Sequence, residues 1–268
     1  FIRYIFVRKD MNCNNEDKIS VVINTYNAAQ HLDEVLEAVK DFDEIVVCDM
    51  DSQDDTLAIA QRHGCKIVHF PRKDFSICEP ARQTAIDAAT SKWILVVDAD
   101  EVVSPELHDY LYGLIREQGA PQGLYIPRKS YFMGKFMHCF YPDYQLRFFI
   151  KQGTYWPPII HADPSIEGKV EKIPAERKDL ALNHLADGSV QCRIGKINQY
   201  TENEVEKKKN KHYGTLALFY RPLVRFFRAY VQKGGFRDGR AGLVCACYEG
   251  IYQFAAVSKL MEHRRNYM

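Results

Sequence analysis

Short apolar runs alternate with segments of helical periodicity along the first part of the chain. The predicted strands cover 19–24, 44–48, 66–70 and 93–97, and each is apolar over most of its length. The predicted helices between them cover 28–40, 54–64 and 79–90, where apolar residues recur at intervals of three and four. This alternation favours an α/β fold, in which a parallel sheet carries helices on both faces.

The regular alternation stops after the fourth strand. Ser104 and Pro105 predict the start of a further helix that runs to about Gly119. Beyond it, short mixed segments rich in aromatic residues follow, and we interpret them as a second half that completes a cleft. The predicted divisions are an N-terminal extension (1–18), an α/β half (19–119), a mixed half (120–205) and a basic helical tail (206–268).

Charge is distributed unevenly along the chain, although its formal net charge is only +1. Residues 207–268 hold 13 Lys and Arg against 3 Asp and Glu, whereas residues 1–206 hold 23 against 32. Such an asymmetry indicates an acidic body with a basic tail, and a basic tail suggests an anionic partner.

The cysteines and the N-terminus both favour a cytosolic protein. The eight cysteines show neither a CxxC pair nor zinc-type spacing, which predicts reduced thiols. The first 18 residues are apolar over only seven positions and lack a small-residue cleavage site, so we do not expect a signal peptide. Met11 is an alternative natural start, with the residues before it an upstream extension.

Two of the predicted strands end in clusters of acidic residues. In "EIVVCDMDSQDDT" the strand is followed by Asp49 and Asp51, and in "WILVVDADE" it is followed by Asp98 and Asp100. Ligands of parallel sheets bind beyond the carboxyl ends of the strands. In an extended strand end, residues two apart point the same way, so both carboxylates of "DAD" can reach one Mg²⁺ or Mn²⁺ ion. The alternative is a solvated loop or a helix cap.

Three motifs in this order and spacing resemble family 2 glycosyltransferases, the inverting enzymes of the GT-A fold. They are "ISVVINTYNAAQHLDEVLEAV", "EIVVCDMDSQDDT" and "ARQTAIDAATSKWILVVDADE", and together they span about residues 19–104. The resemblance implies a nucleotide-sugar donor and the residues that contact it. These are Tyr26 and Asn27 near the base, Asp49 on the uracil, Asp98 near the ribose, Asp100 on the metal that bridges the diphosphate, and Arg82 on the donor.

The sequence departs from the usual family pattern at four positions. Asn24 stands where Pro is common, Asp51 where Gly is common, Gln53 where Thr is common and Gln83 where Asn is common. For Asp51 we expect a structural role in the turn without ligand contact. Arg82 has an alternative interpretation as a surface charge on its helix.

The second half contains "YPDYQLRFF", which resembles an element of the lipopolysaccharide-core glucosyltransferase branch of this family. Inverting transfer needs a base that takes a proton from the acceptor hydroxyl, and Asp143 is our candidate. Arg147 either holds the diphosphate or pairs with an acid. The same branch has histidines at comparable places, which implies His184 as a metal ligand and His161 on the acceptor side. Asp143 as a turn cap and structural histidines are the alternatives.

The tail predicts an amphipathic helix followed by a second helix. Four polar residues fall on one stripe of the first helix: Arg221, Arg225, Arg228 and Gln232. A basic stripe on an otherwise apolar helix suits an anionic membrane surface. The alternative is two helices packed on the body with their arginines in solvent. The following run of residues 241–260 is too polar to predict a membrane span.

We therefore predict a metal-dependent inverting glycosyltransferase on the cytoplasmic face of the inner membrane. Its donor would be a nucleoside-diphosphate sugar, with UDP favoured, and its acceptor a lipid-linked or lipopolysaccharide-core saccharide. The basic tail is assigned to the membrane, and no nucleic-acid partner is expected. Three alternatives are a sugar nucleotidyltransferase, a phosphatase of the haloacid-dehalogenase type, and a non-catalytic membrane-docking protein that binds nucleotide sugars. Against the first, "NTYNAAQH" lacks the Gly-rich basic loop of a nucleotidyltransferase.

Overall fold

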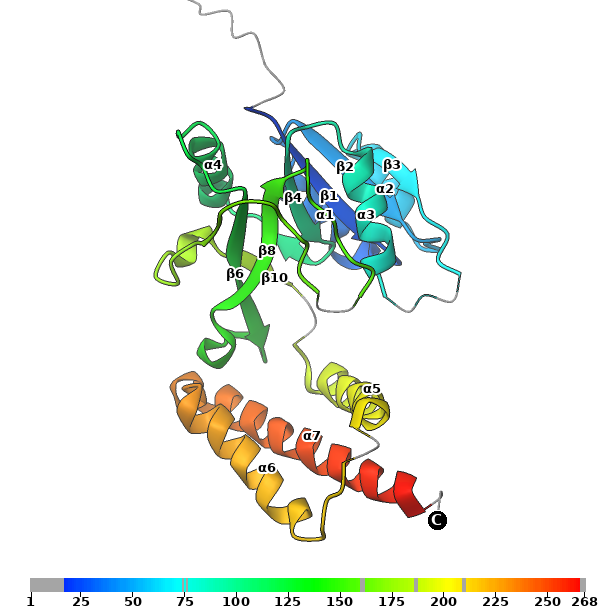
Figure 1. Ribbon diagram of the computed structural model, residues 1–268, viewed down its shortest axis with the longest axis vertical. Helices are drawn as coiled ribbons and strands as arrows, with labels where there is room; N and C mark the ends of the chain where they lie inside the picture. The colour runs from blue at the N-terminus through cyan, green and yellow to red at the C-terminus, as the bar shows by residue number, and fades with distance from the viewer. Residues whose placement is uncertain are drawn as a thin grey trace, which may run out of the picture. The chain divides into compact units, whose positions relative to one another are not determined.

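The computed structural model describes residues 17–73, 75, 77–159, 162–185, 188–208 and 211–265 (Figure 1). It divides into two compact units. Unit 1 holds the described residues up to Ala99, with Val103–Ile126 and Leu146–Ile173. Unit 2 holds Asp100–Val102, Pro127–Gln145 and the described residues from Pro174 onwards.

The core of unit 1 is a parallel sheet built from the apolar runs of the sequence. The strands are β1 (Ile19–Thr25), β2 (Glu44–Asp49), β3 (Lys66–His69) and β4 (Trp93–Asp98). β1 pairs in parallel with both β2 and β4, and β2 pairs in parallel with β3. Every residue of β1 is buried, because a strand covered on both faces has no solvent side. The predicted parallel sheet is confirmed.

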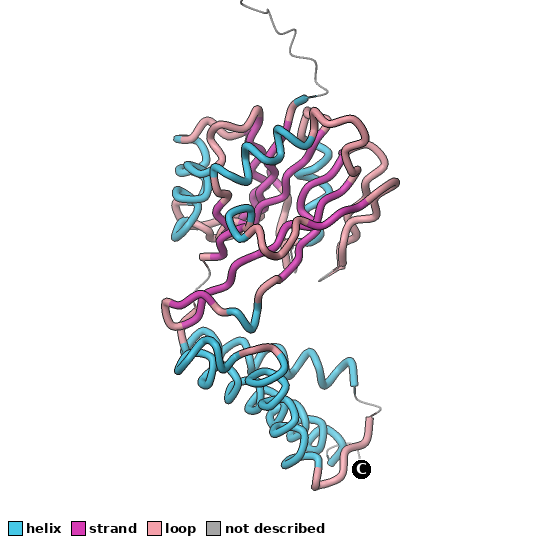
Figure 2. The backbone as a smooth tube through the Cα atoms, turned by 90° about the vertical axis from the view of Figure 1, so that its left-hand side faces the viewer, coloured by secondary structure: helices cyan, strands magenta, loops and turns pink. Residues whose placement is uncertain are grey.

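The helices of unit 1 lie against both faces of the sheet (Figures 1 and 2), and the first three of them connect β1 to β4. They are α1 (Ala29–Ala38), α2 (Thr56–Arg62), α3 (Glu79–Ala88) and α4 (Pro105–Leu114). Ser104 caps α4 by accepting a hydrogen bond from the backbone N–H of Leu107 at 3.2 Å. The helix ends at Leu114, five residues before the predicted end at Gly119.

Two long strands run through both units. β6 (Gly123–Phe132) and β8 (Asp143–Ile150) each begin in one unit and end in the other. β8 is antiparallel to β4, and the strand order of the sheet is β3-β2-β1-β4-β8-β6-β10-β5. The remaining strands are β5 (Glu101–Val102), β7 (Lys135–Phe136), β9 (Val170–Lys172) and β10 (Leu182–His184).

Unit 2 ends in three helices. They are α5 (Val190–Lys208), α6 (Ala217–Phe227), which continues in a π-helical turn over Arg228–Gln232, and α7 (Gly239–Arg265). Short 3₁₀ turns lie at His138–Phe140, Lys178–Leu180 and Gly235–Asp238. No helix in the described part of the chain is long and apolar enough to cross a membrane. The seven described cysteines are all free.

The exposed side of α6 is apolar rather than basic. Arg225 pairs with Glu249 of α7, with Nε 2.9 Å from Oε2, and the guanidinium of Arg221 lies 4.5 Å from the ring centroid of Tyr213. The most exposed apolar residues of this helix and its N-terminal turn are Leu216, Phe219, Leu223, Val224 and Phe227. The helix is amphipathic as predicted, but the arginine stripe partly faces other parts of unit 2.

Candidate active site

Asp49 lies at the end of β2 and is 1 % exposed. Its Oδ1 accepts a hydrogen bond from the Thr25 hydroxyl and its Oδ2 one from the backbone N–H of Ser52, both at 2.9 Å. Each carboxylate oxygen has a second lone pair, so further acceptance is possible. These bonds fix the carboxylate at the carboxyl edge of the sheet, where a ligand of a parallel sheet binds.

Asn27 joins the loops that follow β1 and β2. Its backbone N–H donates to the Ser52 hydroxyl at 2.9 Å, and its Oδ1 accepts from the backbone N–H of Gln53 at 2.8 Å. Its φ of 48° is left-handed, a conformation that Asn tolerates better than most residues. Asn27 therefore shapes this loop pair, whatever it contacts in a ligand.

Tyr26 lies beside Asn27 with 42 % of its surface exposed. The guanidinium carbon of Arg72 lies 3.2 Å from its ring centroid, a cation–π contact that no motif predicted. The backbone N–H of Arg72 donates to Asp51 at 2.8 Å, and the ring of His69 contacts the same carboxylate at 2.6 Å. Both contacts lower the pKa of Asp51, with the His69 bond the larger cause.

Asp51 also has a φ of 60°, which explains why glycine is common at this position in the family. The residue tolerates the left-handed conformation while its side chain binds residues 69 and 72. These contacts agree with the structural role predicted for Asp51.

Asp98, the last residue of β4, is held between two arginines. Arg82 of α3 donates to its Oδ1 at 2.7 Å, and Arg147 of β8 forms an ion pair with its Oδ2. Both arginines are more than nine-tenths buried. Burial opposes the charged form of Arg82, but the Asp98 carboxylate raises its pKa overall. Arg82 is therefore not the surface charge of the alternative interpretation, and Arg147 does pair with an acid.

The two carboxylates of "DAD" do not share an extended strand end. β4 stops at Asp98, Ala99 and Asp100 form a turn, and β5 starts at Glu101. The expectation that both side chains point the same way because they lie two apart in a strand is therefore wrong. Asp98 pairs with arginines, while Asp100 lies 3.3 Å from a histidine.

That histidine is His184, the predicted metal ligand, and its Nε2 lies 3.3 Å from Oδ2 of Asp100. The backbone supports the pair, because Leu185 N–H donates to the Asp100 carbonyl at 2.7 Å and β10 is antiparallel to β5. Ligands bonded at about 2.1 Å in an octahedral site lie roughly 3 Å apart, so both atoms fit one ion. Among the described residues there is no group of three or more His, Cys, Asp and Glu placed to bind a metal. Mg²⁺ and Mn²⁺ accept phosphate and water oxygens for their remaining ligands.

Asp143, the predicted base, begins β8 and contacts Arg128 of β6. Arg128 donates to its Oδ2 from Nε at 2.9 Å and from a terminal nitrogen at 2.6 Å, while Gln145 donates to its Oδ1 at 3.0 Å. Arg128 also donates to Glu101, a fully buried carboxylate, at 3.0 Å. Burial opposes the charge of Arg128, but Glu101 and Asp143 raise its pKa.

Sequence reasoning missed several residues that orient these side chains. Arg128 and Gln145 fix Asp143, Thr25 fixes Asp49, and Arg72 covers Tyr26. Thr25 and Gln145 lie inside quoted segments, but the resemblance assigned them no role, and Arg72 and Arg128 lie in none of the quoted motifs. Hydrogen bonds between strands bring Arg128 to Asp143 and Thr25 to Asp49. His161 lies outside the described residues.

Comparison with known proteins agrees with this fold. The parallel sheet with acidic residues at its strand ends has the GT-A glycosyltransferase fold. A mannosyltransferase from Pyrobaculum calidifontis, solved with GDP-Man and Mn²⁺, superposes with a TM-score of 0.51 over 91% of this chain and 87% of that one, at 14% identity. The chain belongs to the family described as glycosyl transferase family 2, whose model matches residues 20–161.

Two relatives extend over nearly the whole chain. An uncharacterized glycosyltransferase of Rickettsia conorii is 25% identical, covering 94% of this chain and 93% of its own. The lipopolysaccharide core biosynthesis glycosyltransferase LpsC of Rhizobium meliloti is 23% identical, covering 91% and 92%. The protein is therefore a glycosyltransferase, as predicted, and its similarity to these relatives extends beyond the residues that the family model matches.

Proposed function

We propose that this glycosyltransferase is an inverting, metal-dependent enzyme that moves a sugar from a UDP-type donor to a saccharide acceptor. The observation that carries the proposal is the pairing at 3.3 Å of Asp100, in the turn before β5, with His184 of β10, the strand antiparallel to β5. A carboxylate oxygen and an imidazole nitrogen at this spacing suit a divalent ion that takes its other ligands from a diphosphate. A relative of this fold was solved with GDP-Man and Mn²⁺.

The donor would bind at the carboxyl edge of the sheet in unit 1. Asp49 has lone pairs left for a base, and Tyr26 offers an exposed aromatic face next to it. Arg82 and Arg147 place two guanidinium groups beside Asp98, and guanidinium groups are well suited to bind a diphosphate. A bound Mg²⁺ or Mn²⁺ would supply further charge neutralisation for the departing nucleoside diphosphate.

Asp143 would accept the proton of the acceptor hydroxyl. Arg128 and Gln145 hold its carboxylate in one orientation, which a general base needs before its proton affinity matters. Attack from the side opposite the leaving diphosphate then inverts the anomeric centre. His161 stays a proposed acceptor-side residue.

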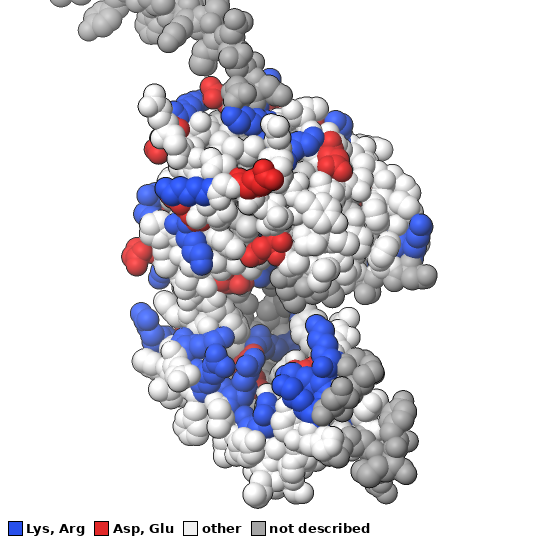
Figure 3. Space-filling model, viewed as in Figure 1, with Lys and Arg blue, Asp and Glu red and all other residues white. Residues whose placement is uncertain are grey.

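The acceptor would be a lipid-linked or lipopolysaccharide-core saccharide, with the enzyme peripheral to the cytoplasmic membrane. A relative that covers nearly the whole chain is named for lipopolysaccharide core biosynthesis. The exposed residues Phe219, Leu223 and Phe227 form an apolar face on α6, and Lys and Arg gather on the helical part of unit 2 (Figure 3). Apolar residues beside basic ones suit an anionic lipid surface.

A thermal-shift panel of UDP, GDP and their sugars, each with and without Mn²⁺, tests the donor site. We expect a uridine nucleotide to raise the melting temperature only when Mn²⁺ is present, because the metal bridges protein and diphosphate. His184→Ala should remove most of the Mn²⁺-dependent shift, whereas His212→Ala, a change in the α5–α6 connection, should keep it. No metal-dependent shift with any nucleotide would contradict the proposal.

Sedimentation with vesicles tests the membrane surface. The variant Phe219→Ser/Leu223→Ser should bind vesicles of mixed phosphatidylglycerol and phosphatidylcholine more weakly than the parent protein. Val170→Ser, an exposed apolar change on β9 in unit 1, serves as the control. Equal binding of all three proteins would exclude this face of α6 from the membrane contact.

A further inference from the structure

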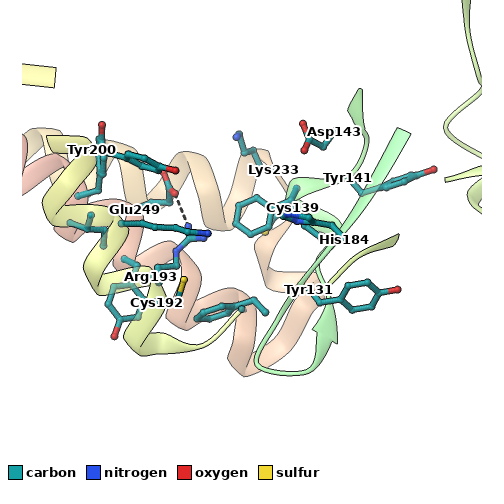
Figure 4. Close-up of a pocket in the computed structure, with 18 of the residues that line it drawn as sticks. Tyr131, Cys139, Tyr141, Asp143, His184, Cys192, Arg193, Tyr200, Lys233 and Glu249 are labelled. Atoms are coloured by element: carbon teal, nitrogen blue, oxygen red, sulfur yellow. Dashed lines mark hydrogen bonds and ion pairs between the residues drawn. The ribbon is translucent and has the colours of Figure 1, made fainter. Parts of the chain in front are cut away.

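Unit 2 contains a cavity of about 920 Å³ between its strands and its C-terminal helices (Figure 4). Its volume lies within the range of roughly 300–1,000 Å³ that is common for ligand pockets. Asp143 and His184 line it, so the cavity reaches the proposed base and the proposed metal ligand. An acceptor whose hydroxyl meets Asp143 would therefore extend into this cavity.

The cavity wall carries an excess of positive charge. Its basic side chains are Arg193, Lys196, Arg225 and Lys233, and its acidic ones are Asp143 and Glu249. The two arginines are occupied, because both donate to Glu249 at 2.9 Å, Arg193 to one oxygen and Arg225 to the other. This arrangement fixes two guanidinium groups on one carboxylate and leaves a net positive charge there.

The two lysines are different from the arginines. Within the described part of the chain, neither Lys196 of α5 nor Lys233 at the end of the π-helical turn forms an ion pair, and both are exposed. Figure 4 shows Lys233 on the same cavity as Asp143 and His184. An ammonium group without a partner beside a polar pocket can donate to an anionic oxygen at little desolvation cost.

Aromatic residues complete the wall with groups suited to a saccharide. Five tyrosines line it: Tyr131, Tyr141, Tyr200, Tyr248 and Tyr252. Tyrosine offers an apolar face for a sugar ring and a hydroxyl for its polar groups. A phosphate or carboxylate alone would not need this surface, which favours an anion attached to a saccharide.

We propose that this cavity binds the acceptor, and that the acceptor saccharide carries a phosphate or carboxylate group that Lys196 and Lys233 hold while Asp143 faces the reacting hydroxyl. The inference rests on the proposed transferase function and names its acceptor class as an anionic saccharide. The shared chemistry is an anionic oxygen on a sugar, whether it comes from a phosphorylated sugar or from a sugar acid.

Ligand-observed NMR titrations of the full chain with glucose 6-phosphate, glucuronate and glucose test the proposal. At least one of the two anionic sugars should bind more than fivefold tighter than glucose, and which one does so identifies the anion. Lys196→Gln and Lys233→Gln should each weaken its binding about fivefold, as expected for one charged contact in a partly exposed pocket. Lys207→Gln, an exposed change on the same α5 helix but outside the cavity, should bind as the parent protein does.

Three results would overturn the proposal. One is equal binding of glucose and both anionic sugars, and another is unchanged binding in the double variant Lys196→Gln/Lys233→Gln. The third is a double variant that loses binding to phosphatidylglycerol vesicles in the absence of sugar, because the lysines would then serve a lipid surface. UDP titration of the parent protein with Mn²⁺ separates the acceptor inference from the proposed function. A parent protein that binds an anionic sugar but not UDP contradicts the proposed transferase mechanism. A parent protein that binds UDP but shows no preference for an anionic sugar contradicts only the acceptor cavity.

Discussion

Two arginine–carboxylate clusters, one in each unit, use the same residue types in opposite proportions. In unit 1, Arg82 and Arg147 share the single carboxylate of Asp98. In unit 2, Glu101 and Asp143 share the single guanidinium of Arg128. The first cluster thus places two guanidinium groups on one carboxylate, and the second places two carboxylates on one guanidinium group.

The difference shows how arginine–carboxylate pairing could serve both parts of the proposed transfer, the departure of the diphosphate and the removal of a proton from the acceptor. Under the proposed function, two guanidinium groups on one carboxylate suit a diphosphate, whose charge grows as it leaves. In the second cluster, Asp143 is partly exposed while Glu101 is fully buried. Unpaired buried charge is costly, so Glu101 secures Arg128, and Arg128 orients Asp143.

The largest expected effect is on kcat and comes from removing the charge of Asp143, the partly exposed carboxylate of the second cluster. Asp143→Asn should lower kcat roughly 10²- to 10⁴-fold, the usual contribution of a general base. Because Glu101 still pairs with Arg128, the fold should be retained, and nucleotide binding measured by titration should be unchanged. Asp179→Asn, an exposed change elsewhere in unit 2, is the control. Full activity in Asp143→Asn would assign the base to another residue.

Removing the carboxylate of the first cluster should act on stability instead. Asp98→Asn removes the charge of the carboxylate that two buried guanidinium groups share, which should cost about 3 kcal/mol of unfolding free energy. Chemical denaturation of the ligand-free protein measures this, with the exposed Asp41→Asn as the matched change. If Asp98→Asn is as stable as Asp41→Asn, solvent rather than Asp98 balances the arginines.

A third buried carboxylate, Asp238, tests whether a carboxylate needs an arginine partner to stabilise the fold. Asp238 accepts from the backbone N–H groups of His138 and Cys139 at 2.9 and 3.1 Å and contacts the His138 ring at 2.7 Å. Burial opposes the ionised form, but these bonds lower the pKa of Asp238 overall. Asp238→Asn should cost about 2 kcal/mol at pH 7, since hydrogen bonds to a charged group are lost.

The pH dependence of that loss has a defined sign. A carboxyl whose pKa is lower in the folded state stabilises the protein above its unfolded pKa of about 3.9, and the stabilisation disappears as the pH falls through the folded pKa. The difference in unfolding free energy between the parent protein and Asp238→Asn should therefore shrink only in acid. A difference that stays constant from pH 7 to pH 3 would show that the charge of Asp238 is unimportant.

The smallest expected effect comes from a positioning residue of the second cluster. Gln145→Ala removes the amide that donates to Oδ1 of Asp143 and should lower kcat about tenfold, because a hydrogen bond to a charged group contributes about 1.5 kcal/mol or more. KM for the donor should not change. Gln145→Asn should not restore kcat, because the shorter Asn side chain does not reach Oδ1 of Asp143. A change in donor KM without a change in kcat would place Gln145 on the donor instead.

The sequence by itself determined the framework of unit 1 and the acids at its strand ends. Apolar strands and amphipathic helices have local periodicities, so β1 to β4 and α1 to α3 can be predicted from neighbouring residues. The family motifs supplied Asp49, Asp98, Asp100 and Asp143 for the same reason, since each motif is a short continuous segment. The pairing of Asp100 with His184 followed from the family resemblance rather than from any spacing.

Only the tertiary structure decided the partners of these acids. Arg147 lies 49 residues from Asp98, Arg128 lies 15 from Asp143, and the turn at Asp100 separates two carboxylates that a strand would have aligned. The cavity that joins Asp143 to Lys196 and Lys233 depends on three segments far apart in the chain. Side-chain partners across strands and helices depend on packing, which local periodicity does not encode, so the charge of each cluster could be known only after folding.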